Sequence, residues 1–284
     1  MNRFDYYEPQ TIEEATKLLF DSGDEANLLA GGTDLIPKLK QKLIRPKAII
    51  NLKKIPGLDF VKAYGKSGLS LGTLTHIADI AVHPLLQERF PLLCVAARSI
   101  GSTQVRNLAT LGGNLCNASP SADMAPGLLV LDAKVKVAGP SGNKEFPLED
   151  FFAGPGKMNL ARGEILMEIR IPFPSPHTKQ IYLKHSIRRA MDIALVGVAV
   201  ALSFDDRTKV CSKARLAFGA VAPTPVRAKK AEGRLVGKKI EEFSLDSVGE
   251  IAAEEVAPIS DVRGSANYRL EMVKELTIEA IKRL

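Results

Sequence analysis

Two segments with adjacent glycines constrain the fold of this chain more than any other feature. The first, LLAGGTDL, spans residues 28–35, and the second, TLGGNL, spans residues 110–115. Adjacent glycines let backbone N–H groups turn toward a ligand without interference from a Cβ, and a following helix adds partial positive charge. Each segment could therefore hold one phosphate of a pyrophosphate. A single glycine pair is more often a plain turn or bulge, so the interpretation depends on both occurring together.

The first fifty residues are typical of a small α/β unit built around the first glycine segment. We expect helices over 11–19 and 35–43, with strands over 26–31 and 48–52. In the second of these helices, Leu35, Leu39 and Leu43 recur every four residues and predict one apolar stripe.

Residues 56–175 predict a second unit of mixed helices and strands. Strands are expected over 69–75 and 163–174, helices near 77–82 and 92–101, and a turn-rich segment over 110–126. Pro172, Pro174 and Pro176 then indicate a linker between domains.

The last hundred residues change to strands followed by helices, which is typical of an α+β domain. The runs 192–204 and 213–222 predict an antiparallel hairpin around a charged turn at 205–209. The tail predicts an amphipathic helix capped by Ser265, with an apolar face formed by Tyr268, Met272, Leu276 and Ala280.

Composition excludes several functional classes. With 45% hydrophobic and 25% charged residues, the chain has the composition of an ordinary globular protein. Its net charge is +7, and the basic residues are scattered along the sequence. Only 6% of residues are aromatic and Trp is absent, so a nucleic-acid surface is not expected. Cys94, Cys116, Cys211 and the four histidines are dispersed, which predicts no metal site. The longest apolar run, 193–202, is too short to span a bilayer, and a cytoplasmic location is expected.

Sequence motifs identify no catalytic acid, base or nucleophile. The chain has no GxGxxG after a strand, no P-loop, no GxSxG and no paired carboxylates in an apolar setting. If the protein is an enzyme, a bound cofactor must supply its reactivity.

Five longer stretches together resemble a known family. They are LLAGGTDLIPKLK, IGSTQVRNLATLGGNLCNASPSADMAPGLLVLDA, GEILMEIRIP, YLKHSIRRAMDIALVGVAV and DVRGSANYR. They are similar, in order and without a large gap, to the FAD-binding medium subunit of molybdenum hydroxylases such as carbon monoxide dehydrogenase and xanthine dehydrogenase. The resemblance implies an α+β chain with an FAD-binding domain of the vanillyl-alcohol oxidase type over 1–175, divided into subdomains 1–55 and 56–175. A C-terminal domain over 178–284, with a small antiparallel sheet and a helical bundle, would follow.

The resemblance also implies a set of cofactor-binding residues. The two stretches expected to wrap the FAD pyrophosphate comprise Leu28, Leu29, Ala30, Gly31, Gly32, Thr33, Asp34, Leu35, Thr110, Leu111, Gly112, Gly113 and Asn114. Ile100, Asp123, Leu166 and Lys184 match further cofactor contacts, and Tyr182 matches an aromatic beside the isoalloxazine ring. Each has an ordinary alternative: Asp123 could cap a helix, Leu166 could belong to the core, and Lys184 could be a solvated strand residue.

The resemblance implies an FAD-dependent oxidoreductase subunit without catalytic side chains of its own. Electrons would pass from [2Fe–2S] clusters on a small partner subunit, through noncovalent FAD, to an external acceptor. A large partner would carry the molybdopterin, and the complex would form a dimer of heterotrimers. Two alternatives remain: a stand-alone flavin-dependent reductase or oxidase of the same fold, and a non-catalytic nucleotide-binding scaffold subunit.

Overall fold

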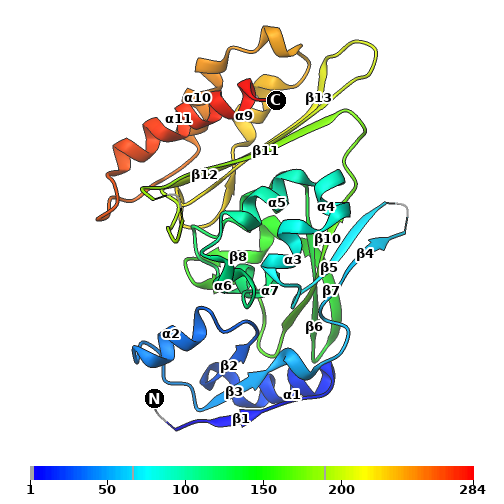
Figure 1. Ribbon diagram of the computed structural model, residues 1–284, viewed down its shortest axis with the longest axis vertical. Helices are drawn as coiled ribbons and strands as arrows, with labels where there is room; N and C mark the ends of the chain where they lie inside the picture. The colour runs from blue at the N-terminus through cyan, green and yellow to red at the C-terminus, as the bar shows by residue number, and fades with distance from the viewer. Residues whose placement is uncertain (1–2, 66, 189) are drawn as a thin grey trace.

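The computed structural model describes residues 3–65, 67–188 and 190–284, and its larger sheets follow one another along the long axis of the molecule (Figure 1). Residues 1 and 2, at the start of the predicted first domain, lie outside this description. The combination of helices with largely antiparallel sheets confirms the expected α+β class. Among the described residues, no helix has the length and hydropathy needed to cross a membrane.

The first unit is a parallel sheet with strand order β1-β3-β2. Its elements are β1 (Asp5–Tyr7), α1 (Ile12–Ser22), η1 (Gly23–Glu25), β2 (Ala26–Leu29), α2 (Leu35–Lys40) and β3 (Ala48–Asn51). Helix α1 begins as expected, because the Thr11 hydroxyl accepts the N–H of Glu14. The predicted stripe in α2 is wrong at its end. Lys42 adopts a left-handed conformation with φ 60°, which terminates the helix and leaves Leu43 69% exposed.

The second unit is an antiparallel sheet with strand order β4-β5-β10-β6-β7. Its strands are β4 (Val61–Tyr64), β5 (Gly68–Gly72), β6 (Lys134–Gly139), β7 (Gly142–Pro147) and β10 (Ile165–Pro172), with the short pair β8 (Phe152–Gly154) and β9 (Lys157–Met158). Its helices are η2 (Leu52–Lys54), α3 (Ile77–Val82), α4 (Pro84–Arg89), α5 (Pro91–Arg98), α6 (Thr103–Arg106), α7 (Leu111–Cys116), α8 (Met124–Val130) and η3 (Leu148–Phe151). The expected turn-rich segment over 110–126 is therefore wrong at its two ends, which form α7 and the start of α8, whereas turns remain over 117–123 between them.

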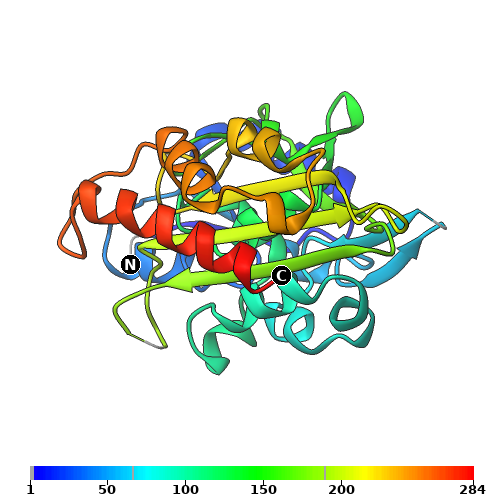
Figure 2. The ribbon, with the colours of Figure 1, turned by 90° about the horizontal axis from the view of Figure 1, so that it is seen from above.

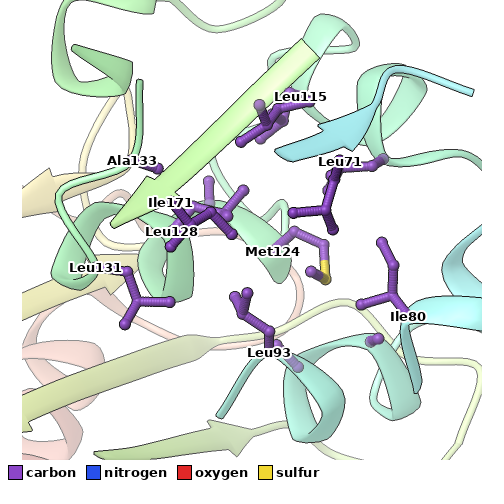
Figure 3. Packing of buried hydrophobic residues seen from close by; sticks show 14 of the residues in the cluster. Leu71, Ile80, Leu93, Leu115, Met124, Leu128, Leu131, Ala133 and Ile171 are labelled. Atoms are coloured by element: carbon purple, nitrogen blue, oxygen red, sulfur yellow. The ribbon is translucent and has the colours of Figure 1, made fainter. Parts of the chain in front are cut away.

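The main core lies between this sheet and the helices. Leu71 from β5 and Ile171 from β10 pack toward Leu93 of α5 and Met124 of α8 (Figure 3). Every residue of α8 is buried, so this helix is fixed by packing on all sides.

The third unit is an antiparallel sheet with strand order β11-β12-β13-β14. Its elements are β11 (Thr178–His185), β12 (Val196–Phe204), β13 (Cys211–Gly219), β14 (Val226–Arg227), α9 (Lys229–Leu235), η4 (Ile240–Glu242), α10 (Leu245–Glu254) and α11 (Ala266–Lys282). The β12–β13 pairing confirms the predicted hairpin, and the Ser265 hydroxyl caps α11 as expected. The predicted face of α11 is confirmed at Ala280, which is buried, and is displaced by one position over the preceding turns. There the buried residues are Arg269, Val273 and Thr277, whereas Tyr268 is 44% exposed and Met272 and Leu276 are only partly buried.

The central strand β12 is covered on both faces. Helix α11 crosses one face of the sheet (Figure 2), and α5 and α8 pack on the other. Large residues such as Val198 and Val200 belong to the cluster with α11, while the small Ala199 and Ala201 belong to the main core with α8. Tyr182 of β11 pairs with Ala199, so the close packing of α8 on this face brings Tyr182 to the second unit.

Candidate functional site

The first glycine segment joins β2 to α2 and carries a row of unbonded backbone donors. Gly32 has φ 76°, a conformation that glycine adopts without steric cost. Within the described part of the chain, the N–H groups from Gly31 to Leu35 donate no hydrogen bond to protein. Several successive free donors are suited to an anionic group such as the predicted phosphate.

The second glycine segment differs from the expected open turn, because it forms the first turn of α7. Its first two N–H groups donate to the carbonyls of residues 75 and 73, and that of Gly113 donates to the Thr110 hydroxyl at 3.1 Å. The side-chain oxygen of Asn114 is buried and accepts no hydrogen bond from the described residues. A Cβ on Gly113 would meet only the Thr110 hydroxyl oxygen, at 2.9 Å. This segment therefore offers the Asn114 amide and an open glycine surface in place of free backbone donors.

The first glycine segment contacts residues that flank the second one, although the two segments belong to different units of the fold. A Cβ added to Gly31 would lie 2.1 Å from the carbonyl oxygen of Leu108, two residues before Thr110. A second contact joins Asn117, the residue after α7, to α2 and its preceding residue. Sequence reasoning missed this second contact, because its partners lie 79 and 83 positions away from Asn117.

Asp123, Tyr182 and Lys184 form one buried cluster between α8 and β11. The Tyr182 hydroxyl donates to Asp123 Oδ1 at 2.7 Å, and Lys184 Nζ donates to Asp123 Oδ2 at 2.9 Å. Lys184 Nζ also donates to the Ser99 carbonyl at 3.0 Å. Asp123 stands at the N-cap position of α8 but makes no capping hydrogen bond, so the helix-cap alternative is wrong. Tyr182 and Lys184 share one face of β11, as their two-residue spacing predicts.

Burial dominates the titration of this cluster. Burial raises the pKa of Asp123, and the charge and hydrogen bond of Lys184 oppose that shift without reversing it. Burial and the neighbouring Asp123 carboxylate together raise the pKa of Tyr182 well above its ordinary value. The tyrosine therefore stays protonated and acts as a hydrogen-bond donor at neutral pH.

The remaining predicted contacts lie mostly inside the protein. Leu166 on β10 is 2% exposed and belongs to the main core, as does Ile100, which is 9% exposed. Leu29 is also 9% exposed and packs with Leu39 of α2. Leu166 and Ile100 can therefore reach a cofactor only with the small part of each side chain that the core leaves uncovered.

One group of potential metal ligands was not anticipated. Asp59, His76 and Asp79 place one ligand atom each within 4.8 Å of one another, and each of these side chains is at least 40% exposed. The two His–Asp distances are 3.7 and 3.8 Å. Such exposed groups also occur as ordinary surface ion pairs, so the geometry alone identifies no metal site.

Comparisons with known proteins agree with the layout of the chain. The family model described as "FAD binding domain in molybdopterin dehydrogenase" matches residues 2–174, and "CO dehydrogenase flavoprotein C-terminal domain" matches residues 181–284. The chain is 35% identical to the putative xanthine dehydrogenase FAD-binding subunit of Escherichia coli, over 97% of this chain and 94% of that protein. It is 33% identical to the carbon monoxide dehydrogenase medium chain of Hydrogenophaga pseudoflava, over 98% of this chain and 96% of that one.

A solved structure supports the same assignment. Carbon monoxide dehydrogenase from Hydrogenophaga pseudoflava superposes with a TM-score of 0.94 at 32% identity. The match covers 99% of this chain and 96% of the matched chain. Sequence and fold therefore agree over the full length of the protein.

Proposed function

The chain belongs to the FAD-binding medium subunits of the molybdenum hydroxylases, and we propose that it holds one FAD noncovalently between its two glycine segments. It is thus an FAD-dependent oxidoreductase subunit that passes electrons from an iron–sulfur partner to an external acceptor. Bound FAD supplies reversible one- and two-electron redox chemistry. The chain's own residues need only bind, orient and shield the cofactor, which fits the absence of an acid–base motif in the sequence.

The row of free N–H groups from Gly31 to Leu35 is the observation that carries this proposal. Unbonded backbone donors are costly unless water or a ligand accepts from them, and a pyrophosphate is a strong acceptor. The orphaned Asn114 oxygen adds an acceptor on the second segment, which suits a hydroxyl or N–H donor of the same ligand. The residues present therefore fit an FAD, with donors on one segment and an acceptor on the other.

We assign the cluster of Asp123, Tyr182 and Lys184 to orienting the cofactor and setting its electrostatic surroundings. The carboxylate is held by two donors and is almost fully buried, so its charge stays in one place. A fixed, poorly solvated charge pair acts over a longer range than a solvated one. These residues thus influence the reduction potential of a nearby flavin more than its retention.

Partner subunits follow from membership of a family of medium subunits. A [2Fe–2S] cluster needs four converging Cys or His ligands, and the three cysteines and four histidines of the chain are dispersed along the sequence. We therefore place the iron–sulfur clusters on a small partner and the molybdopterin on a large partner, in a dimer of heterotrimers.

An FAD titration of the purified chain tests the proposal. FAD should bind with a visible flavin spectrum, and it should be released on denaturation because neither glycine segment contains a His or Cys for covalent attachment. Gly32→Val and Gly113→Val should abolish binding, since each adds a β-branched side chain where backbone must approach the ligand. Full binding by both variants would refute the placement, and turnover of purines, aldehydes or carbon monoxide by the single chain would favour a stand-alone flavoenzyme.

A further inference from the structure

Asn117, two residues after the second glycine segment, joins that part of the chain to the first segment and to α2. Its oxygen accepts a hydrogen bond from Lys38 Nζ at 2.7 Å, and its nitrogen donates to Asp34 Oδ1 at 3.3 Å. Asp34 precedes α2 and Lys38 lies on that helix, whereas Asn117 is the C-cap residue of α7. One amide therefore bridges helices α2 and α7, which belong to different units of the fold.

Two contacts thus connect the first segment and α2 to residues that flank the second segment. Gly31 lies against the Leu108 carbonyl, where there is no room for a Cβ. Asp34 and Lys38 form the hydrogen bonds with Asn117. Along the chain, the free N–H groups of Gly32 and Thr33 lie between Gly31 and Asp34, and Asn114 with its orphaned oxygen lies between Leu108 and Asn117.

We propose that Asn117, through Lys38 and Asp34, is a positioning residue that fixes the spacing of the two glycine segments for the FAD pyrophosphate. The inference depends on the proposed placement of FAD between these segments. A preorganised spacing lowers the entropy lost on binding, because the two segments do not have to be ordered by the ligand. Both donor and acceptor groups of the amide are used, so an apolar replacement breaks both connections at once.

The bridge contributes little to the stability of the folded apoprotein. Asn117 and Lys38 are half-buried and Asp34 is exposed, so loss of the bonds leaves groups that water can reach. The contact of Gly31 with Leu108 also remains in place. The effect of removing the bridge should therefore fall on the affinity for FAD rather than on folding of the apoprotein.

The test is a double-mutant cycle in which the dissociation constant of FAD and the apoprotein melting temperature are both measured. Asn117→Ala should raise the dissociation constant about tenfold, because FAD must then order the spacing of the two segments itself, and it should leave the melting temperature nearly unchanged. Asn107→Ala is the matched control. Asn107 is the C-cap of α6 with φ −67° and ψ −17°, nearly the values of −65° and −17° at Asn117, and its side chain makes no hydrogen bond within the described residues. This control should bind FAD like the unaltered protein.

Lys38→Met supplies the second arm of the cycle. If Asn117 and Lys38 act as one bridge, the double variant should bind FAD about as weakly as Asn117→Ala alone. Multiplicative losses would mean that Lys38 contacts the ligand independently, and they would overturn the proposal, as would unaltered affinity in Asn117→Ala. If Asn117→Ala melts early, Lys38→Met alone breaks the bridge and keeps Asn117 in place. It should raise the dissociation constant of FAD at an unaltered melting temperature, and unaltered affinity in this variant would also overturn the proposal.

Failure of the unaltered protein to bind FAD would instead refute the proposed function. The two failures are thus distinguishable in the same titration.

Discussion

The contrast between Gly31→Ala and Gly113→Ala separates the packing role of a glycine from its role in ligand binding. A Cβ on Gly31 would lie 2.1 Å from a backbone carbonyl oxygen, and no change of side-chain rotamer can relieve that contact. The two segments must then move apart by about 1 Å to reach an ordinary separation. Overpacking of this kind costs about 1–3 kcal/mol, and a clash with backbone belongs at the upper end of that range.

The same substitution at Gly113 meets only the Thr110 hydroxyl oxygen, at 2.9 Å. That hydroxyl caps α7 by accepting the N–H of Gly113, so moving it aside costs about 1 kcal/mol. Replacing glycine by alanine within a helix gains up to about 1 kcal/mol, which offsets this cost. Gly113→Ala should thus leave the apoprotein close to its original stability, yet it places a methyl group on the surface that we assign to FAD.

Differential scanning calorimetry of the apoproteins and an FAD titration should therefore rank the variants in opposite ways. Gly31→Ala should melt about 4–8 °C lower, using roughly 2–3 °C per kcal/mol for a chain of this size. Gly113→Ala should melt within about 2 °C of the unaltered protein but bind FAD at least tenfold more weakly. An unaltered melting temperature in Gly31→Ala would refute the reasoning from the close contact, and unaltered FAD affinity in Gly113→Ala would refute its assignment to the ligand surface.

Further predictions concern titratable groups. Lys184→Met should lower the free energy of unfolding by about 3 kcal/mol or more, because it leaves Asp123 buried without its cation. Tyr182→Phe should retain FAD but shift the midpoint potential of the flavin in a redox titration, and an unaltered potential with unaltered reoxidation kinetics would leave Tyr182 a purely structural role. Burial raises the pKa of the Cys116 thiol to about 12, so at pH 8 a thiol reagent should modify this half-buried side chain far more slowly in the folded protein than in the denatured one. Burial works to raise the pKa of Asp132, but hydrogen bonds from basic side chains outweigh this and hold it below its ordinary value. Its contribution to stability should be complete above about pH 4 and be lost as the pH falls further, and thermal melts of Asp132→Asn should show a weaker acid dependence.

Elements with local signals could be predicted from the sequence. Thr11 and Ser265 cap α1 and α11 as expected, and the charged turn at 205–209 joins β12 to β13. Each of these features is decided by residues within a few positions of one another. The face of α11 was misassigned because Arg269 reads as a surface residue, whereas its guanidinium donates to the buried carbonyls of Leu195 and Ala220. A sequence does not reveal such distant acceptors.

Helix α7 was not predicted, and α8 was expected only as the alternative in which Asp123 caps a helix, because the residues of both helices favour turns in isolation. The first contains Gly112, Gly113 and Asn114, and the second contains Pro126 and Gly127. Glycine and proline disfavour helices intrinsically, but tertiary packing overrides that preference where the segment is buried. Here α8 is buried along its whole length, so the core determines its conformation.

The candidate site shows the same division between local and distant signals. The sequence resemblance identified Asp123, Tyr182 and Lys184 as separate cofactor contacts, but their mutual hydrogen bonds span 59 and 61 positions and follow only from the packing of α8 against β11. The bridge through Asn117 had no signal at all, since a single asparagine after a helix is common. Sequence reasoning therefore proposed the residues of the candidate site and missed the contacts that join them.

The contacts of the individual glycines explain why each segment has two adjacent glycines. In each pair the first glycine packs against backbone: Gly31 against Leu108, and Gly112 against Thr73, where a Cβ would lie 2.7 Å from the carbonyl oxygen. The second glycine is free of backbone contacts, since a Cβ on Gly32 or Gly113 would meet side-chain atoms only. The first position thus lets the segment lie directly on its neighbour. The second position serves a different need in each segment: Gly32 adopts φ 76°, which glycine allows without steric cost, and Gly113 leaves a surface that only the Thr110 hydroxyl adjoins. A single glycine could not meet both requirements, so each pair is explained by close backbone packing at its first glycine and by the conformation or the open surface needed at its second.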